Sequence, residues 1–165
     1  MPATPDELLA ELARLGISAS TIEHPPMFTV EDSKTLRGTL IGTHTKNLFV
    51  KDKKSRLFLL VAEESAVITL KQVHTLIGAS GRVSFGAADL LLEVWGVTPG
   101  SVTPFGALND TAGRVNVVLE KGLMAHDILN FHPLINTRTT SIAAADLIKF
   151  LRSTGHEPLI CRFAG

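Results

Sequence analysis

Two apolar runs joined by a basic turn are the feature that most limits what this chain can fold into. Residues 46–52 read KNLFVKD, residues 56–62 read RLFLLVA, and the turn KKS at 53–55 separates them. Short runs rich in valine, leucine and phenylalanine on either side of such a turn are typical of a β-hairpin. We therefore predict that the two runs are antiparallel neighbours in a sheet.

The rest of the chain predicts helices interleaved with further strands. The N-terminal helix is the best marked, because Thr4 and Glu7 have capping-box spacing, Pro5 fits the first helical position and Gly16 follows the apolar face. This order of elements predicts an α+β fold around a mixed, largely antiparallel sheet, in a single domain spanning residues 1–165. The other predicted helices are 29–38, 69–78 with Thr69 as cap, 87–96 and 141–155; the other predicted strands are 17–26, 82–86, 115–121 and 157–163; and residues 96–110 are predicted as a loop.

The charge balance limits the kind of partner. The 165 residues include 16 basic and 16 acidic side chains, so the formal net charge is zero. A protein that grips DNA through a broad basic face would carry a net positive charge. We therefore expect no DNA partner, although the balance still allows a local basic patch.

The N-terminus and the cysteine content indicate a cytoplasmic protein. The first residues are acidic where a signal peptide would be basic, and no apolar run approaches the ~20 residues that span a bilayer. The single cysteine, Cys161, has no partner for an internal disulfide, which suits a reducing compartment. We expect no membrane partner.

Several common catalytic arrangements are missing. The sequence contains no phosphate-binding glycine loop, no GxSxG motif, no HExxH motif and no histidine pair at four-residue spacing. We therefore expect no metal and no cofactor. Cys161 lies within a strand-like run, where a cysteine is more often a small core residue than a nucleophile.

Polar groups gather in three segments instead. These are Lys46–Asn47, the glycine-rich GSVTP segment 100–104, and NFHPLINT at 130–137, which contains His132 and Asn136. Each has a plain structural interpretation: a solvated lysine, a connecting loop and a structural histidine at a helix entry. Because all three lie at the ends of elements, we predict that together they form one pocket.

Lys46 raises a specific question about its strand. Side chains alternate between the faces of a strand, so Thr45, Asn47 and Phe49 point one way while Lys46, Leu48 and Val50 point the other way. If the strand is buried, the lysine shares a face with two aliphatic residues. An ammonium group in such a place calls for an anionic ligand or for a solvated outer face.

The sequences HTKNLF, GVTPGSVTPFG and NFHPLIN…TT resemble the YbaK/prolyl-tRNA editing family, over nearly the whole chain from about His24. The KN pair and the HPLxN motif look most like the branch that removes alanine from mischarged tRNA(Pro). The resemblance implies a barrel-like sheet and hydrolysis of an aminoacyl ester in trans. It places the family's lysine at Lys46, followed by Asn47, its GxxxP loop at Gly100–Pro104 and its C-terminal histidine at His132.

The resemblance also implies roles for these residues. An aminoacyl ester is already activated, so a protein that orients water and stabilises an oxyanion can hydrolyse it. We expect Lys46 to meet the terminal adenosine, Asn47 and His132 to hold the ester and the amino group or the water, and amides near Gly100 to meet the oxyanion. The expected substrate-binding residues are Phe28, Val30, His44, Thr45, Phe49, Ser101, Val102, Thr103, Pro104 and Asn136.

The basic turn of the hairpin is a candidate contact for tRNA. Lys51, Lys53, Lys54 and Arg56 stand beside one acidic residue, Asp52. They are expected to contact the phosphates of the acceptor stem, and the alternative interpretation is a solvated hairpin tip. The expected partner is aminoacylated tRNA(Pro), with prolyl-tRNA synthetase as a further candidate.

Two other functions remain open. One is a Cys-tRNA(Pro) deacylase of the same family. The other is a non-catalytic module that binds an amino acid or tRNA.

Overall fold

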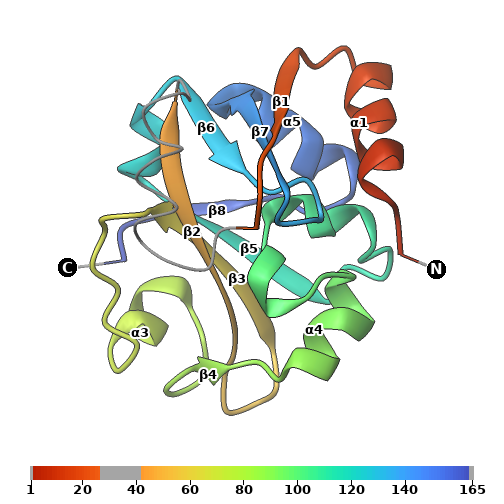
Figure 1. Ribbon diagram of the computed structural model, residues 1–165. Helices are drawn as coiled ribbons and strands as arrows, with labels where there is room; N and C mark the ends of the chain where they lie inside the picture. The colour runs from red at the N-terminus through yellow and green to blue at the C-terminus, as the bar shows by residue number, and fades with distance from the viewer. Residues whose placement is uncertain (1, 27–41, 164–165) are drawn as a thin grey trace.

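The computed structural model describes residues 2–26 and 42–163 as an α+β fold built on an eight-stranded sheet (Figure 1). The helix predicted at 29–38 lies outside these residues, as do Phe28 and Val30. The helices are α1 (Pro5–Arg14), α3 (Val73–Ile77), α4 (Ala88–Trp95) and α5 (Ala144–Ser153), with short 3₁₀ turns η1 (Pro99–Ser101), η2 (Pro104–Leu108) and η3 (Leu123–Ala125). The strands are β1 (Ala19–Glu23), β2 (Thr43–Lys51), β3 (Leu57–Glu63), β4 (Ser84–Phe85), β5 (Val115–Glu120), β6 (Ile128–Phe131), β7 (Arg138–Ala143) and β8 (Leu159–Cys161).

The sheet is mixed and largely antiparallel, which confirms the predicted fold class. Its strand order is β1-β7-β6-β2-β3-β5-β8, and β4 pairs with β2 on the edge away from β3. The pairs β1–β7, β6–β7, β2–β3 and β2–β4 are antiparallel, while β2–β6, β3–β5 and β5–β8 are parallel. The β2–β3 hairpin therefore forms as predicted, and β2 joins the two halves of the sheet.

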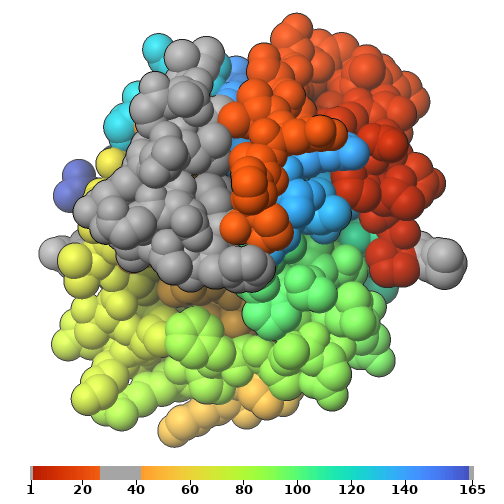
Figure 2. All heavy atoms as spheres, in the orientation of Figure 1, coloured from red at the N-terminus to blue at the C-terminus, as the bar shows by residue number. Residues whose placement is uncertain are grey.

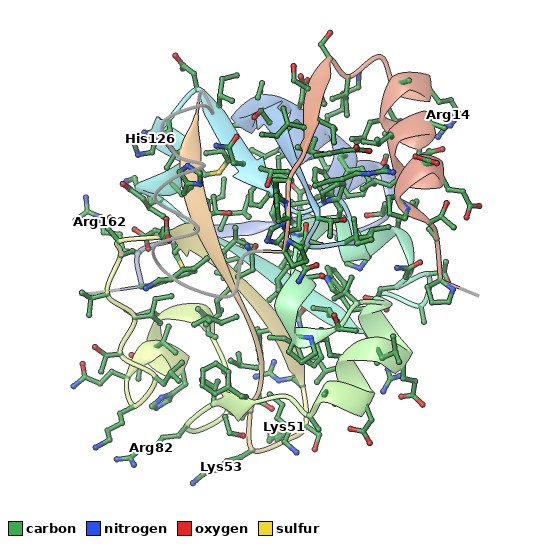
Figure 3. The ribbon with its side chains drawn as sticks, viewed as in Figure 1. Arg14, Lys51, Lys53, Arg82, His126 and Arg162 are labelled. Carbon is green, nitrogen blue, oxygen red and sulfur yellow. The ribbon has the colours of Figure 1, made fainter. Side chains whose placement is uncertain are left out.

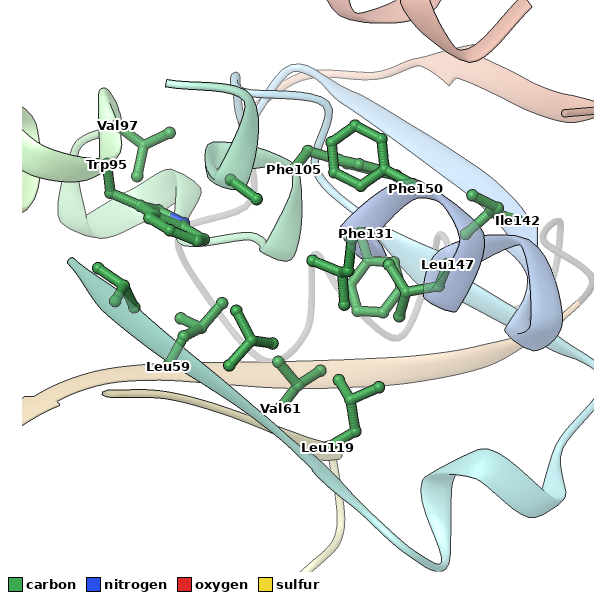
Figure 4. Packing of buried hydrophobic residues seen from close by; sticks show 14 of the residues in the cluster. Leu59, Val61, Trp95, Val97, Phe105, Leu119, Phe131, Ile142, Leu147 and Phe150 are labelled. Carbon is green, nitrogen blue, oxygen red and sulfur yellow. The ribbon is translucent and has the colours of Figure 1, made fainter. Parts of the chain in front are cut away.

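The sheet bends around one main apolar cluster. Figure 4 shows Leu59, Val61 and Leu119 of β3 and β5 facing Phe131 and residues of β7 and α5 across this cluster. Helices α1 and α4 and the turn η2 supply the remaining walls. A second, smaller cluster lies on the opposite face of β2 and β3 and packs against α3. The part of β2 between the clusters is thus covered on both faces.

The strongest local signals are confirmed. In α1, the Thr4 hydroxyl oxygen accepts a hydrogen bond from the Glu7 amide and the Glu7 side chain accepts one from the Thr4 amide, so both halves of the capping box form. Leu8 and Leu12 point into the main cluster. Helix α4 ends at Gly96, whose φ of +75° is the left-handed conformation that glycine adopts most easily.

Two predicted helices need correction, and two strands were not predicted. Residues 128–131 and 138–143 form strands β6 and β7, so α5 begins at Ala144 and not at residue 141. The signal for β7 is tertiary, because this strand is held by β1 on one side and β6 on the other. Helix α3 is shorter than predicted: its N-cap is Gln72, and Thr69 instead accepts backbone bonds from Gln72 and Val73 in a preceding turn.

Within the described ranges, no helix has the length and apolar content needed to cross a bilayer.

Candidate active site

Strand β2 sends Lys46 and Asn47 to opposite faces of the sheet. Lys46 lies opposite Ala62, which belongs to the second cluster, and Asn47 lies opposite Val61, which belongs to the main cluster. Lys46 therefore shares its face with the aliphatic Leu48 and Val50, as the alternation predicts. Its ammonium group donates a hydrogen bond to the carbonyl oxygen of Ala66. Because an ammonium has three donors, two have no partner among the described residues.

The face that carries Lys46 continues across β6 and β7 as a polar surface. Residue 44 of β2 lies beside Asn130 of β6, and Asn130 lies opposite Ser141 of β7, so these side chains share one face. The Ser141 hydroxyl donates to the Asn130 side-chain oxygen at 2.6 Å. The opposite face at the neighbouring positions, Leu129 and Ile142, packs into the main cluster. One face of this half of the sheet thus serves the core, and the other collects polar groups.

His132 follows β6 at the end of this polar face. Its Nδ1 lies 3.0 Å from the carbonyl oxygen of Arg138, so Nδ1–H donates this bond and Nε2 is the nitrogen left to accept. Within the described ranges, Nε2 has no protein partner. Burial lowers the pKa of His132, the bond to the Arg138 carbonyl opposes that effect, and nearby His24 lowers the pKa further. The neutral imidazole is therefore favoured near pH 7.

His24 is a second histidine at this site, and the sequence analysis did not select it. Its ring centroid lies 6.3 Å from that of His132. Its Nδ1 contacts the Pro25 carbonyl oxygen at 2.9 Å and its Nε2 contacts the Thr139 hydroxyl at 2.7 Å. Pairing of β1 with β7 creates this arrangement, so no local motif could have revealed it. A pocket beside the two rings is lined by Glu23, His24, Ile135, Thr137 and Arg138.

The loop after His132 is strained and meets the glycine-rich segment. Leu134 has a φ of +68°, in the left-handed region that non-glycine residues rarely adopt. A Cβ atom on Gly100 would lie 3.4 Å from the side-chain nitrogen of Asn136. Gly100, Asn136 and His132 therefore belong to two adjoining loops, as the predicted pocket requires.

Most of the GSVTP segment is scaffold. Ser101, Thr103 and Pro104 are buried. The Thr103 carbonyl oxygen accepts a hydrogen bond from the Trp95 indole at 2.6 Å, and the Thr103 hydroxyl oxygen accepts one from the Phe105 amide. The Thr103 contacts fix the loop, and burial leaves little of these three side chains exposed to a ligand. Gly100 and the half-buried Val102 are the members of this segment placed to contact one.

Asn47 and Asn130 each keep one unused polar atom. The Asn47 side-chain nitrogen lies 3.5 Å from the Thr45 hydroxyl, which donates to the Asn130 carbonyl oxygen at 2.7 Å. The Asn47 side-chain oxygen and the Asn130 side-chain nitrogen are buried and find no partner in the described ranges. Unpaired buried amides cost free energy, about 1–3 kcal/mol each, so both need an explanation. Asn130, 3% exposed, was not selected from the sequence.

Phe49 belongs to the core more than to a pocket. It is 4% exposed, and Gly86 lies so close to its ring that a Cβ atom there would clash at 2.4 Å. Its predicted role as a wall that a substrate touches is therefore not supported by its position. His44 lies on the Lys46 face and lines a different pocket with Thr43, Glu63, Glu64 and Ser65, close to the His126–Glu63 contact of 3.2 Å.

The basic hairpin tip lies at the other end of β2. Figure 3 shows Lys51 and Lys53 at the end of the molecule opposite His126. Lys51 is five residues from Lys46, or about 17 Å at the usual rise of a strand. Arg56 has a structural role, because it bonds to Asp52, the Gly78 carbonyl and the Ser80 hydroxyl. The tip is therefore separate from the candidate pocket.

Cys161 and the metal-binding types of side chain offer no second centre. Burial raises the pKa of the Cys161 thiol, and the nearby Glu120 carboxylate raises it further, so the reactive thiolate is disfavoured. Over residues 2–26 and 42–163, no group of three or more His, Cys, Asp and Glu side chains could hold a metal ion.

The comparisons with known proteins identify the class to which this fold belongs. Residues 24–150 match the family model described as the aminoacyl-tRNA editing domain, and the chain belongs to that family. It is 34% identical over 150 residues to the prolyl-tRNA editing protein ProX of Acetoanaerobium sticklandii, covering 90% of this chain and 91% of that one. It is 39% identical over 159 residues to the prolyl-tRNA synthetase associated domain-containing protein 1 of Danio rerio, covering 95% and 86% of the two chains.

A solved structure confirms the fold. A crystal structure of a candidate trans-editing enzyme for prolyl tRNA synthetase superposes with a TM-score of 0.71, covering 98% of this chain and 99% of that chain. The two sequences are 14% identical over this match. The shared feature is therefore the mixed sheet with its flanking helices.

Proposed function

We propose that this protein is an aminoacyl-tRNA deacylase that acts in trans and removes alanine from mischarged tRNA(Pro). The observation that carries the proposal is the arrangement of His132, whose Nδ1 is fixed by the Arg138 carbonyl while Nε2 has no described partner. The names of the relatives support prolyl-tRNA as the substrate class and prolyl-tRNA synthetase as an associated protein.

The proposed reaction needs no covalent intermediate. Neutral His132 accepts a proton from water through Nε2, and the resulting hydroxide adds to the ester carbonyl carbon. The oxyanion then collapses, the bond to the ribose oxygen breaks, and that oxygen takes the proton from His132. The Asn130 amide, which has no partner in the described ranges, and backbone amides near Gly100 are the proposed donors to the oxyanion. Asn47 lies on the other face of β2 from Asn130, so its contact with the substrate stays a prediction.

Lys46 is proposed to hold the terminal adenosine through its phosphate or sugar. It shares a strand face with Leu48, and among the described residues its ammonium bonds only to the Ala66 carbonyl. The phosphate or sugar would then be the ligand that explains an ammonium group on an aliphatic strand face. Lys46→Ala should slow deacylation, while Lys149→Ala, on the exposed side of α5, should not.

Selection of alanine is proposed to rest on the size of the pocket. A site that binds proline discriminates against a smaller side chain by only ~1–3 kcal/mol, so a second site that is too small for proline is needed. Val102 of the glycine-rich segment is the proposed wall in the described part of the chain. Val102→Ala should raise hydrolysis of the prolyl ester relative to the alanyl ester; an unchanged ratio would remove Val102 from this role.

The deciding experiment is a deacylation assay on tRNA(Pro) charged with alanine, cysteine or proline. Rapid loss of alanine with proline spared is the expected result. Preferential loss of cysteine would assign the protein to the alternative Cys-tRNA(Pro) activity. Binding of the charged tRNA with no loss of any amino acid would contradict the proposal and support a non-catalytic binding module.

The hairpin tip is proposed to contact the tRNA backbone through Lys51, Lys53 and Lys54, which are exposed. Arg56 is left out because its guanidinium is engaged by Asp52 and the 78–80 loop. Contacts to phosphate release counterions, so binding of tRNA should weaken as salt rises. Equal affinity for tRNA at about 50 mM and about 200 mM salt would contradict this role.

A further inference from the structure

Phe85 is an exposed aromatic side chain on a short edge strand. It is 61% exposed and forms the two-residue strand β4 with Ser84. Phe85 lies opposite Val50, and Ser84 lies opposite Lys51. Since directly opposed residues share a face, Phe85 lies on the face of β2 that carries Val50, Leu48 and Lys46. A single exposed apolar residue needs no explanation by itself, so its surroundings decide what it can do.

Those surroundings are cationic. Lys51, Lys53, Lys54 and Arg82 are all exposed, and in the described ranges none of them makes an ion pair. Figure 3 shows Lys51, Lys53 and Arg82 gathered at one end of the molecule. In Figure 2 the green segment around β4 lies on the visible face directly beside the light orange hairpin tip. We call Phe85 and these four cations the tip surface.

A buried clamp holds the tip surface together. Asp52 is 5% exposed and accepts hydrogen bonds from the amides of Lys54, Arg56 and Ser80 and from the Arg56 side chain. These bonds tie the hairpin to the loop that leads to Arg82 and Phe85. These bonds also bury Asp52, the one acidic side chain of the turn, against Arg56. Asp52 therefore does not neutralise the four exposed cations.

We propose that Phe85 is a stacking platform for an unpaired base of an RNA 3′ strand whose phosphates contact Lys53 and Arg82. The cations select a polyanion, and an aromatic face in their midst selects a polyanion with exposed bases. The inference rests on the proposed function, because the esterified end of a tRNA is a short unpaired strand.

The distance along β2 matches the length of such a strand, which would pass outside the second cluster because Val50 is buried in it. Position 50, which lies opposite Phe85, is four residues from Lys46, about 13 Å along β2. Stacked nucleotides rise about 3.4 Å each, so that distance corresponds to about four steps from one nucleotide to the next. A 3′ end whose terminal adenosine reaches Lys46 would bring a nucleotide near the start of the unpaired strand to Phe85.

The test measures binding of an uncharged RNA hairpin that carries a four-nucleotide unpaired 3′ end. Base–aromatic stacking is worth about 1–3 kcal/mol, so Phe85→Ala should raise Kd about fivefold to a hundredfold. Phe85→Trp should keep the affinity, because it keeps a ring. The matched control is Leu159→Ala on β8, which is 46% exposed at the opposite edge of this half of the sheet and should bind as wild type.

Two further measurements separate this inference from the proposed function. A 2-aminopurine placed in the unpaired strand should be quenched on binding by the wild type and less by Phe85→Ala. The small ester alanyl-adenosine monophosphate should be hydrolysed by Phe85→Ala at the wild-type rate, because it does not reach the tip surface. Wild-type RNA affinity in Phe85→Ala, or equal binding of a blunt hairpin, would overturn the stacking role even if deacylation is confirmed. Phe85-dependent binding without deacylation would keep the stacking role and reject the proposed function.

Discussion

Two histidine clusters in this protein differ in how completely the fold uses their polar atoms. His156 is buried between Asp110 at 2.8 Å and the Thr154 hydroxyl at 2.9 Å, so both ring nitrogens have protein partners, and its ring meets the edge of Trp95. His132 has one nitrogen bonded to the Arg138 carbonyl and one without a described partner.

The difference separates structural histidines from candidate catalytic ones. Asp110 also accepts bonds from the amides of Arg114 and Val115, so the His156 cluster ties the end of α5 to the start of β5 and leaves nothing for a ligand. The His132 cluster continues into a loop with a left-handed Leu134, and in the described ranges the side-chain amide of Asn130, on the preceding strand, has an atom without a partner. A fold tolerates such costs where a ligand can offset them.

The largest expected effect is on catalysis at His132. His132→Ala should lower kcat/KM for alanyl-tRNA(Pro) by about a hundredfold or more, the usual range for loss of a general base. Its thermal midpoint should change little, because only one hydrogen bond is lost. The control His126→Ala removes a half-exposed histidine that pairs with Glu63 and should keep full activity. Equal activity in the two variants would erase the contrast between the clusters.

The reverse pattern is expected at Asp110. Asp110→Ala leaves His156 and two backbone amides without an acceptor in a buried place, and breaking such a cluster costs about 3–5 kcal/mol. Urea unfolding measures this loss, and the folded fraction should deacylate at the wild-type rate. Stability close to wild type would mean that the His156–Asp110 cluster contributes less to the free energy of unfolding than its hydrogen bonds indicate.

Asp52 is a second buried group whose side-chain oxygens have protein partners, as those of Asp110 do. Burial alone would raise its pKa, but bonds from Ser80, Arg56 and Lys54 outweigh that effect and hold the pKa at about 2, below the usual 3.8. A lowered folded-state pKa adds stability that is complete above about pH 4 and is lost as the pH falls through 2. The shift corresponds to at most about 2 kcal/mol.

The measurement at Asp52 is unfolding of the wild type and of Asp52→Asn at pH 7 and again near pH 2. Asn keeps the shape of the side chain but lacks the charge, so the wild type should be more stable at pH 7, and the gap should close at low pH. A gap of the same size at both values would show that charge at residue 52 does not produce the difference.

The sequence predicted what depends on neighbours along the chain. The capping box of α1, the glycine end of α4 and the alternation of β2 are set by residues within one or two turns, and all were confirmed. His132 follows the end of β6, as the polar-segment prediction expected, whereas Lys46 lies inside β2, which begins at Thr43, three residues before the strand predicted at 46–52.

What the sequence could not supply depends on register between distant strands. His24 reaches Thr139 because β1 pairs with β7, and Asn130 reaches Ser141 because β7 pairs with β6. Arg56 was predicted to face a nucleic acid because the turn is basic. Its actual partner is the Asp52 carboxylate, in a cluster completed by the loop some 22 residues further on. Local pattern therefore located the polar groups, but only the pairing shows which of them are free.

The smallest expected effect is the shape of the pH profile. Because burial and His24 lower the pKa of His132, neutral imidazole persists to more acidic pH than for an ordinary histidine. The loss of kcat/KM on the acid side should therefore occur only at pH values below about 6.5. Above that value, kcat/KM should stay constant toward pH 8. The charged groups around the ring are His24 on the end of β1 and Arg138 on β7, and Arg138 pairs with Asp6 and Glu23.

Removing His24 separates the two causes of the low pKa. In His24→Asn the electrostatic effect by which His24 lowers the pKa of His132 is absent, so the acid limb should move toward higher pH. An unmoved limb would assign the effect to burial of His132 alone. If the acid limb of kcat/KM is unchanged in His132→Asn, a group other than His132 titrates there. Nε2 of His132 would then bind the substrate ammonium and would not be the base that activates water.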